Sequence, residues 1–175
     1  MATVTGAVTF AEFEQLPDIP GKRELLNGEV IDLPPAKRIH IAIVVALANR
    51  LLHLLPENRV WVEGGYRIGE GYLIPDVSVS HPDQPVDNDY LQRAPMLAIE
   101  VASGGNTPEQ LDSKVTLYLQ NGGQEVWVVY PKNRHMMVFH ASGAIERVTG
   151  AWTSPATGLT FDIAELIVTR LNELH

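Results

Sequence analysis

The chain has 175 residues, of which 45% are hydrophobic and 19% are charged; this suffices for one domain with a full core and is too short for two comfortable ones. Because it contains no cysteine, disulfides, zinc–thiolate sites and thiol catalysis are excluded. A net charge of −8 counts against a protein that coats DNA, although the cation of an acidic metal site would invert the charge locally. We expect a single domain over residues 1–175.

The hydrophobicity pattern contains no targeting or membrane signal. Residues 1–6 lack the basic and apolar regions of a secretion signal, and no apolar run approaches the ~20 residues that a membrane helix needs. We therefore expect a cytoplasmic protein with no membrane partner.

The first third of the chain predicts a short helix, a hairpin and a long helix. Thr9 to Glu12 form a capping box, which starts a helix that ends before Pro17. Asn27-Gly28 is typical of a type I′ turn and predicts a hairpin over residues 24–33. A helix over about residues 37–55 carries apolar residues at helical spacing, which predict one broad face packed on a sheet: Ile41, Val44, Val45, Ala48, Leu51, Leu52 and Leu55.

The rest of the chain alternates predicted strands and helices. Residues 59–68 and 73–80 read as a strand pair, and the polar segment 81–95 is expected to be a mobile loop. Thr107-Pro108 begins a helix that ends near residues 121–123. The remaining predicted elements are strands at residues 96–102, 125–130, 135–141 and 144–148, and a helix over 163–171.

Three ionisable residues fall within or beside these apolar elements. Asp76 and Glu100 each lie in a β-branched run that predicts a buried strand, where an ionised carboxylate is costly unless it is paired or bound to metal. Consecutive antiparallel strands would set the two side by side, where a hard divalent cation could stabilise both. Lys114 flanks the apolar stripe of its helix and could act on a phosphate or water held by that ion. The trio predicts a metal-dependent hydrolytic site.

Each member of the trio also has a purely structural interpretation. Asp76 could form a turn or cap a strand end after its proline. Glu100 could pair with a buried arginine such as Arg67, and Lys114 could be an ordinary surface lysine that buries only its stem.

Other polar and aromatic residues are interpreted as structural or surface features. The basic pairs Lys22-Arg23 and Lys37-Arg38 are interpreted as solvated surface, because both are short. Tyr118 and Trp127 are most simply aromatic residues of the core.

An ordered series of short motifs covers most of the chain. The motifs are residues 23–30, His40, Pro75-Asp76-Val77, residues 99–103, residues 114–118 and residues 125–129. In this order they resemble the PD-(D/E)XK nuclease superfamily, and more narrowly its Uma-type restriction endonucleases, which are frequent in cyanobacteria. The resemblance implies a restriction-endonuclease-like fold of the α/β (α+β) class, in which helices flank a central mixed sheet.

The resemblance also implies roles for individual residues. Asp76 and Glu100 match the motif acids that together bind Mg²⁺ or Mn²⁺. The lysine that usually follows two residues after the second acid is replaced by Ala102, and Lys114 on the next helix stands in its place. The implied reaction is hydrolysis of phosphodiester bonds in DNA, with Lys114 orienting the attacking water.

Two further residues and two departures from the family pattern belong to this comparison. Glu24 is a possible additional acidic ligand, and His40 a possible contact to the site or a phosphate, although structural roles in the hairpin and at the helix start are equally consistent with both. Tyr130 stands where relatives often carry an aspartate, and residues 103–106 replace a common Ser-Pro-Ser loop with a more flexible glycine pair.

Three classes of function remain open from the sequence. The first is a metal-dependent DNA endonuclease, for which cleavage of both strands favours a homodimer by analogy. The second is a catalytically inactive nuclease fold that serves as an interaction or nucleic-acid-binding module. The third is a hydrolase of small phosphoesters that uses the same ion. A basic groove wide enough for duplex DNA would separate the first class from the third.

Overall fold

Two β-sheets and the helices around them account for residues 6–85 and 89–172, which the computed structural model describes. One sheet has five strands in the order β2-β1-β5-β4-β7, and the other has six in the order β11-β10-β9-β8-β6-β3. The helices are α1 (Phe10–Phe13), α2 (Arg38–Leu54), α3 (Pro108–Gln120) and α4 (Ile163–Asn172), with short 3₁₀ turns at Glu57–Arg59 and Pro131–Asn133. The strands are β1 (Lys22–Leu26), β2 (Glu29–Leu33), β3 (Val60–Val62), β4 (Tyr66–Ile68), β5 (Gly71–Leu73), β6 (Val77–Val79), β7 (Leu91–Gln92), β8 (Leu97–Val101), β9 (Glu125–Tyr130), β10 (His135–His140), β11 (Ile145–Val148), β12 (Ala151–Thr153) and β13 (Thr160–Asp162).

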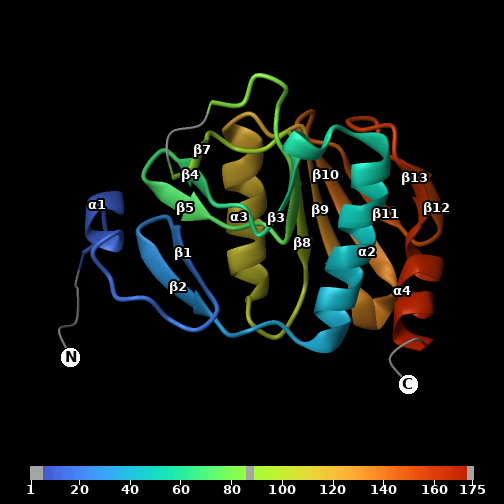
Figure 1. Cartoon of the computed structure of the whole chain (residues 1–175), viewed down its shortest axis with the longest axis horizontal. Coiled ribbons are helices and arrows are strands. Elements are labelled where there is room, and N and C mark those ends of the chain that lie inside the picture. The colour runs from blue at the N-terminus through green and yellow to red at the C-terminus, as the bar shows by residue number, and fades with distance from the viewer. Residues whose placement is uncertain (1–5, 86–88, 173–175) are drawn as a thin grey trace.

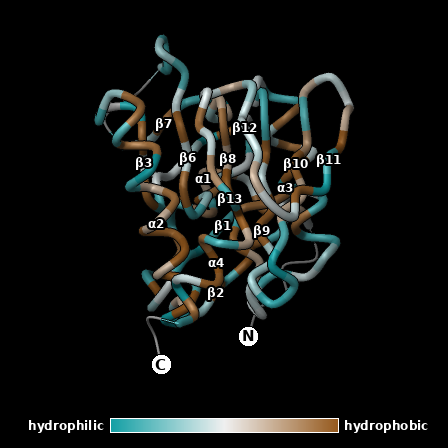
Figure 2. The backbone as a smooth tube through the Cα atoms, turned by 90° about the vertical axis from the view of Figure 1, so that its right-hand side faces the viewer, coloured by the Kyte–Doolittle hydropathy of each residue, from teal (hydrophilic) through white to brown (hydrophobic). Residues whose placement is uncertain are grey.

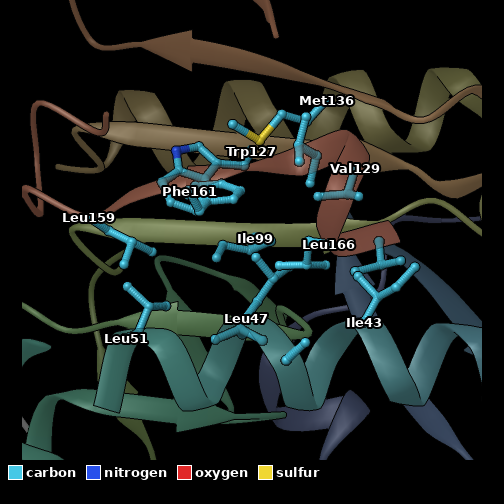
Figure 3. Close-up of a cluster of buried hydrophobic side chains, with 14 of the residues drawn as sticks. Ile43, Leu47, Leu51, Ile99, Trp127, Val129, Met136, Leu159, Phe161 and Leu166 are labelled. Atoms are coloured by element: carbon cyan, nitrogen blue, oxygen red, sulfur yellow. The ribbon is translucent and has the colours of Figure 1, made fainter. Parts of the chain in front are cut away.

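The elements are arranged in layers. Helix α3 lies between the two sheets, and α2 and α4 cover the opposite face of the six-stranded sheet (Figure 1). One apolar cluster joins both sheets through α3, and a second lies between the six-stranded sheet and helices α2 and α4. Figure 3 shows the second cluster, in which Ile43, Leu47 and Leu51 of α2 face Ile99 and Trp127 of the sheet. The predicted mixed sheet flanked by helices is confirmed.

Strands β8 and β9 are covered on both faces, which explains their almost continuously apolar sequences. They are parallel neighbours, and α3 forms the connection between them, as parallel pairing requires. All five residues of β8 are buried, including Glu100. An ionisable residue in this strand is shielded from bulk water and needs partners inside the protein or a bound cation.

Figure 2 shows that the apolar stretches of backbone lie in the interior strands and along α2, whereas hydrophilic stretches form the connecting loops. Most apolar stretches are part of the packed core, whereas β3 exposes Trp61 and Val62. In the part of the chain that the structure describes, no helix has both the length and the apolar character needed to cross a bilayer. The cytoplasmic location stays a prediction.

Several local elements follow directly from the sequence. The hairpin β1–β2 turns at Asn27 and Gly28, which adopt φ values of 52° and 80°, as a type I′ turn requires. Capping boxes begin α1 and α3: the side chains of Thr9 and Thr107 accept from backbone N–H groups, and Glu12 and Gln110 accept in return. These predictions are confirmed.

The predicted strand pair 59–68 and 73–80 is one hairpin that belongs to both sheets. Val62 pairs with Val77 in the six-stranded sheet, and Tyr66 pairs with Leu73 in the five-stranded sheet, so the antiparallel register continues unchanged between them. The hairpin bends where Gly64-Gly65 on one arm and Ile74 to Asp76 on the other leave the regular ladder. The prediction of two unbroken strands was therefore incomplete, and Asp76 lies at the bend.

The buried face of α2 differs from the prediction. Ile41 and Val45 are each 49% exposed and Leu52 is 37% exposed, whereas Ile43 and Leu47 are completely buried. The helix is apolar around much of its circumference, so its sequence alone allows more than one inward face. Packing against the sheet and α4 selects the face that contains His40.

The predictions for two other regions also need correction. The polar segment 81–95 contains β7, which pairs in parallel with β4, and its residues 86–88 lie outside the described residues. The small hairpin β12–β13 was not predicted, because its strands are only three residues long.

Candidate functional site

Asp76 is buried at the bend of the long hairpin and has three partners from different elements. Its Oδ1 accepts from Lys22 Nζ of β1 at 2.5 Å and lies 3.2 Å from Nε2 of His40 on α2. Its Oδ2 accepts from the backbone N–H of Val101 at 2.7 Å. The contact with Val101 agrees with the alternative that Asp76 only caps a strand end. That alternative does not explain why Lys22 and His40 also contact Asp76.

These partners control the ionisation of Asp76. Burial alone would raise its pKa, but the hydrogen bond from His40 and the nearby ammonium of Lys22 outweigh burial and hold the pKa well below its usual range. The pKa of Lys22 is lowered by burial and raised more strongly by Asp76 and Glu100, so the lysine stays protonated. Asp76 is therefore a carboxylate at all physiological pH values.

Glu100 lies beside Asp76 on the neighbouring strand. The register that pairs Val77 with Ile99 sets Asp76 opposite Glu100, as the predicted antiparallel pairing requires. Oε1 of Glu100 lies 2.8 Å from Lys114 Nζ and accepts from the hydroxyl of Tyr118 at 3.0 Å. The alternative that Glu100 pairs with Arg67 is wrong, because the guanidinium of Arg67 lies over the ring of Phe10 at 4.4 Å.

Lys114 is completely buried between two glutamates. Its Nζ donates to Oε1 and Oε2 of Glu24 at 2.9 Å and 3.0 Å, in addition to the contact with Glu100. The alternative of a surface lysine is wrong. Glu24 is also completely buried, and its Oε1 accepts from the backbone N–H of Ile74 at 2.8 Å. Glu24 therefore connects Lys114 to the bend that carries Asp76.

The charges of this cluster do not cancel. With Glu100 ionised and His40 neutral, Glu24, Asp76 and Glu100 supply three carboxylates and Lys22 and Lys114 supply two ammonium groups, which leaves one negative charge. Burial raises the pKa of Glu100 to about 7, against the lowering effect of Lys114, and the charges of its acidic neighbours add to the rise. Glu100 is the carboxylate with the least compensation and is the one that most needs a further cation.

The same buried environment shifts the pKa values of Lys114 and Tyr118. Burial would lower the pKa of Lys114, but the charges of Glu100 and Glu24 outweigh burial and raise the pKa above its usual value. The lysine therefore remains charged. Burial raises the pKa of Tyr118 far above its usual range, and the charge of Glu100 contributes to the rise. Tyr118 is therefore a neutral donor to Glu100.

A cavity of about 710 Å³ opens beside Asp76. Residues from six segments line it: the start of β1, the loop from β2 into α2, the first half of α2, the end of β3, the bend at Asp76 and the loop after β8. Asp76, Lys22 and His40 supply polar groups, while Ile41 and Val45, the exposed apolar residues of α2, form part of the wall. The loop after β8 contributes Ser103, Gly104, Gly105 and Asn106. A ligand in this cavity reaches Asp76 directly.

The structure thus brings Asp76, Glu100, Lys114, Glu24 and His40 into one connected cluster. Sequence analysis missed two members. Lys22 was interpreted as solvated surface, which is wrong, although its spacing of two residues from Glu24 on one strand places both on the same face. Tyr118 was interpreted as core only, although it follows Lys114 by four residues on one helix face.

The donor set suits a hard divalent cation. Among residues 6–85 and 89–172, no three His, Cys, Asp or Glu side chains converge in a way that would enclose a metal ion. Two carboxylates are nevertheless sufficient for Mg²⁺, which retains waters and takes substrate phosphate oxygens as ligands. The ion pair and the hydrogen bond of Glu100 both go through Oε1, so Oε2 is the oxygen that would join Asp76 in holding such an ion.

Comparisons with known proteins agree with this fold and place the chain in a family. A crystal structure of a "putative nuclease belonging to DUF820" from Anabaena variabilis ATCC 29413 superposes with a TM-score of 0.82, at 20% sequence identity, over 93% of this chain and 99% of that one. At this identity the likeness establishes the fold alone. No curated protein matches. The model of the family described as "Putative restriction endonuclease" (Uma2) matches residues 10–164, and the chain therefore belongs to the Uma2 family.

Proposed function

We propose that this protein is a metal-dependent endonuclease that hydrolyses phosphodiester bonds in DNA, with Asp76 and Glu100 as the ligands of Mg²⁺ or Mn²⁺. The observation that carries the proposal is the pair of buried carboxylates, Asp76 at the bend before β6 and Glu100 opposite it on β8, of which Asp76 lines a cavity that a substrate can enter. Membership of the Uma2 family supports a nuclease over other uses of such a pair.

The chain's own residues would prepare the site for this reaction. When bound, the ion supplies Lewis acidity that activates a water and offsets charge on the phosphate. Val101 N–H and His40 orient Asp76, and Tyr118 and Lys114 orient Glu100, so both carboxylates are held before an ion arrives. The wall of the cavity is partly apolar, so a substrate that covers it would displace water and strengthen electrostatic interactions with the phosphate.

The test of this function is nicking of supercoiled plasmid by the purified protein. We expect cleavage with Mg²⁺ or Mn²⁺ and none after addition of EDTA. Protein that binds Mn²⁺ in calorimetry but cleaves only small phosphodiesters would favour the third class of function, a hydrolase of small phosphoesters. Protein that neither binds Mn²⁺ nor cleaves DNA would favour a non-catalytic module. A homodimer, with one site for each strand, stays a prediction that sedimentation can check.

The raised pKa of Glu100 predicts that metal affinity depends on pH. Because the folded-state pKa lies above the ordinary value, the proton on Glu100 stabilises the metal-free fold at low pH, and this contribution is lost as the pH rises through about 7. A metal ion needs the ionised form, so it competes with that proton. We expect Mn²⁺ to bind about tenfold more weakly at pH 6 than at pH 7.5, because each pH unit below the pKa costs about a factor of ten.

Isothermal titration at the two pH values measures this difference. Glu100→Gln has no proton to release, so we expect weak binding with no pH dependence. Glu29→Gln, at an exposed position of β2, serves as the matched control, since it leaves Glu100 and its partners in place and should keep the dependence. A wild-type affinity that is the same at both pH values would contradict the assignment of Glu100 as a ligand.

A further inference from the structure

The cluster contains two lysines that differ in their access to the cavity. Lys114 has no exposed surface and does not line the cavity. Its three short contacts, two to Glu24 and one to Glu100, equal the number of N–H donors on an ammonium group. To reach a substrate, Lys114 would have to leave a buried glutamate unpaired, which is strongly unfavourable.

Lys22, unlike Lys114, is partly exposed and lines the cavity. Its side chain is 17% exposed and lines the cavity together with Asp76. Its Nζ makes one short contact, to Asp76 at 2.5 Å, and two long ones, to the carbonyl of Ile74 at 3.4 Å and to Glu63 at 3.9 Å. The ammonium therefore has donor capacity left for a group in the cavity and can turn toward it without losing Asp76.

The cavity also contains a second donor that lacks a partner. Nδ2 of Asn106, in the loop after β8, is buried and has no hydrogen-bond partner among the described residues. A buried amide N–H without an acceptor costs free energy that a ligand oxygen would recover. Asn106 and Lys22 line the same cavity from different segments, and a reorientation of the enclosed Asn106 amide would let both donate to an anion there.

We propose that Lys22 is the lysine that contacts the scissile phosphate, with Asn106 as a second donor, and that Lys114 is a positioning residue for Glu100. This inference rests on the proposed nuclease function and changes which lysine acts on the substrate. In the reaction, a water oxygen bonds to phosphorus and one ester P–O bond breaks. One proton of the water goes to the leaving oxygen and the other stays with the new phosphate monoester or is released. Lys22 donates to a non-bridging oxygen and offsets its charge.

The absence of cysteine from the chain permits a direct test by chemical rescue. Lys22→Cys introduces a single thiol, and alkylation with bromoethylamine converts it into a lysine analogue with sulfur in place of one methylene. We expect Lys22→Cys to lower metal-dependent nicking about a hundredfold, the effect of removing one donor to a transition-state oxyanion. Alkylation, verified by mass spectrometry, should restore the rate to within a few-fold of wild type.

Binding supplies a readout that does not depend on turnover. A fluorescently labelled DNA oligonucleotide, titrated with Ca²⁺ in place of Mg²⁺, should bind Lys22→Cys about tenfold more weakly than wild type and recover after alkylation. Lys132→Cys, at an exposed position outside the cavity, is the matched control and should cleave and bind as wild type before and after alkylation. Alkylated wild type, which has no thiol, controls for reaction elsewhere.

The outcomes separate this inference from the proposed function. If Lys22→Cys cleaves and binds as wild type, or if its defects persist after complete alkylation, Lys22 does not contact the phosphate. Should Lys22→Cys fail to fold, Lys22→Met and Lys22→Arg take its place, and equal activity in both would overturn the inference. If wild type binds the oligonucleotide but never cleaves it, the nuclease proposal falls and the binding data alone decide the role of Lys22. If wild type does neither, both proposals fall.

Discussion

Asp76→Asn is expected to reduce metal-dependent nicking of plasmid about a thousandfold or more. The substitution keeps the shape of the side chain and removes the charge that an ion requires. A metal ion contributes several kcal/mol of charge stabilisation to such a reaction, and about 4 kcal/mol corresponds to a factor of a thousand. Initial rates of conversion from supercoiled to nicked plasmid measure the effect, and Mn²⁺ calorimetry on the same variant should show that binding is lost.

Asp32→Asn is the matched control for this experiment. Asp32 also pairs with a basic residue of β1, since its Oδ1 accepts from Arg23 Nε at 2.6 Å, but it is exposed and lies outside the cluster. We expect wild-type cleavage from this variant, because exposed ion pairs contribute little to stability. Asp76→Asn that folds normally and retains a tenth or more of the wild-type rate would contradict the role assigned to Asp76.

Lys114→Met is expected to destabilise the fold by about 3–5 kcal/mol, the usual cost of removing one member of a buried ion pair. The methionine fills much of the space of the lysine, so the loss arises from charge more than from packing. It leaves Glu24 and Glu100 in the interior without their ammonium partner. Urea denaturation followed by circular dichroism measures the free energy of unfolding, and the slope of the transition should not change.

Two further variants identify the source of this loss. Glu24→Gln on the Lys114→Met background removes one of the unpaired charges, so the double variant should be more stable than Lys114→Met alone. Lys132→Met removes an exposed lysine and should change the stability by less than about 0.5 kcal/mol. If Lys114→Met unfolds at the same urea concentration as wild type, the buried ion pairs do not stabilise the protein as described.

Local rules were sufficient to predict the elements that are determined by short-range chemistry. The Asn27-Gly28 turn fixes the register of β1 and β2 through its backbone conformation, and the capping boxes fix the starts of α1 and α3. The bend in the long hairpin has no comparable signal. It arises because one pair of strands is shared between two sheets, one part packing with α2 and the other belonging to the apolar cluster that contains α3.

In the candidate site, too, sequence analysis found the residues that have a local signal and missed a residue that only the tertiary fold brings into the site. Asp76 and Glu100 could be found because a charged residue inside an apolar strand is costly and therefore informative. Lys22 could not be distinguished from a surface lysine, because its partner lies more than fifty residues away and only the pairing of β1 with β5 brings them together. The exposed apolar residues of α2 were misassigned for a related reason, since helical periodicity does not specify which side of an apolar helix meets the sheet.

The bent hairpin has a consequence for how activity depends on the integrity of the fold. Glu24 belongs to the five-stranded sheet, Glu100 to the six-stranded sheet and Lys114 to the helix between them, while Asp76 lies where the hairpin passes from one sheet to the other. No single layer contains a complete site. If the proposed function is right, a nascent or partly unfolded chain would expose no hydrolytic centre to nucleic acids, and the protein would become reactive only when all its layers are assembled.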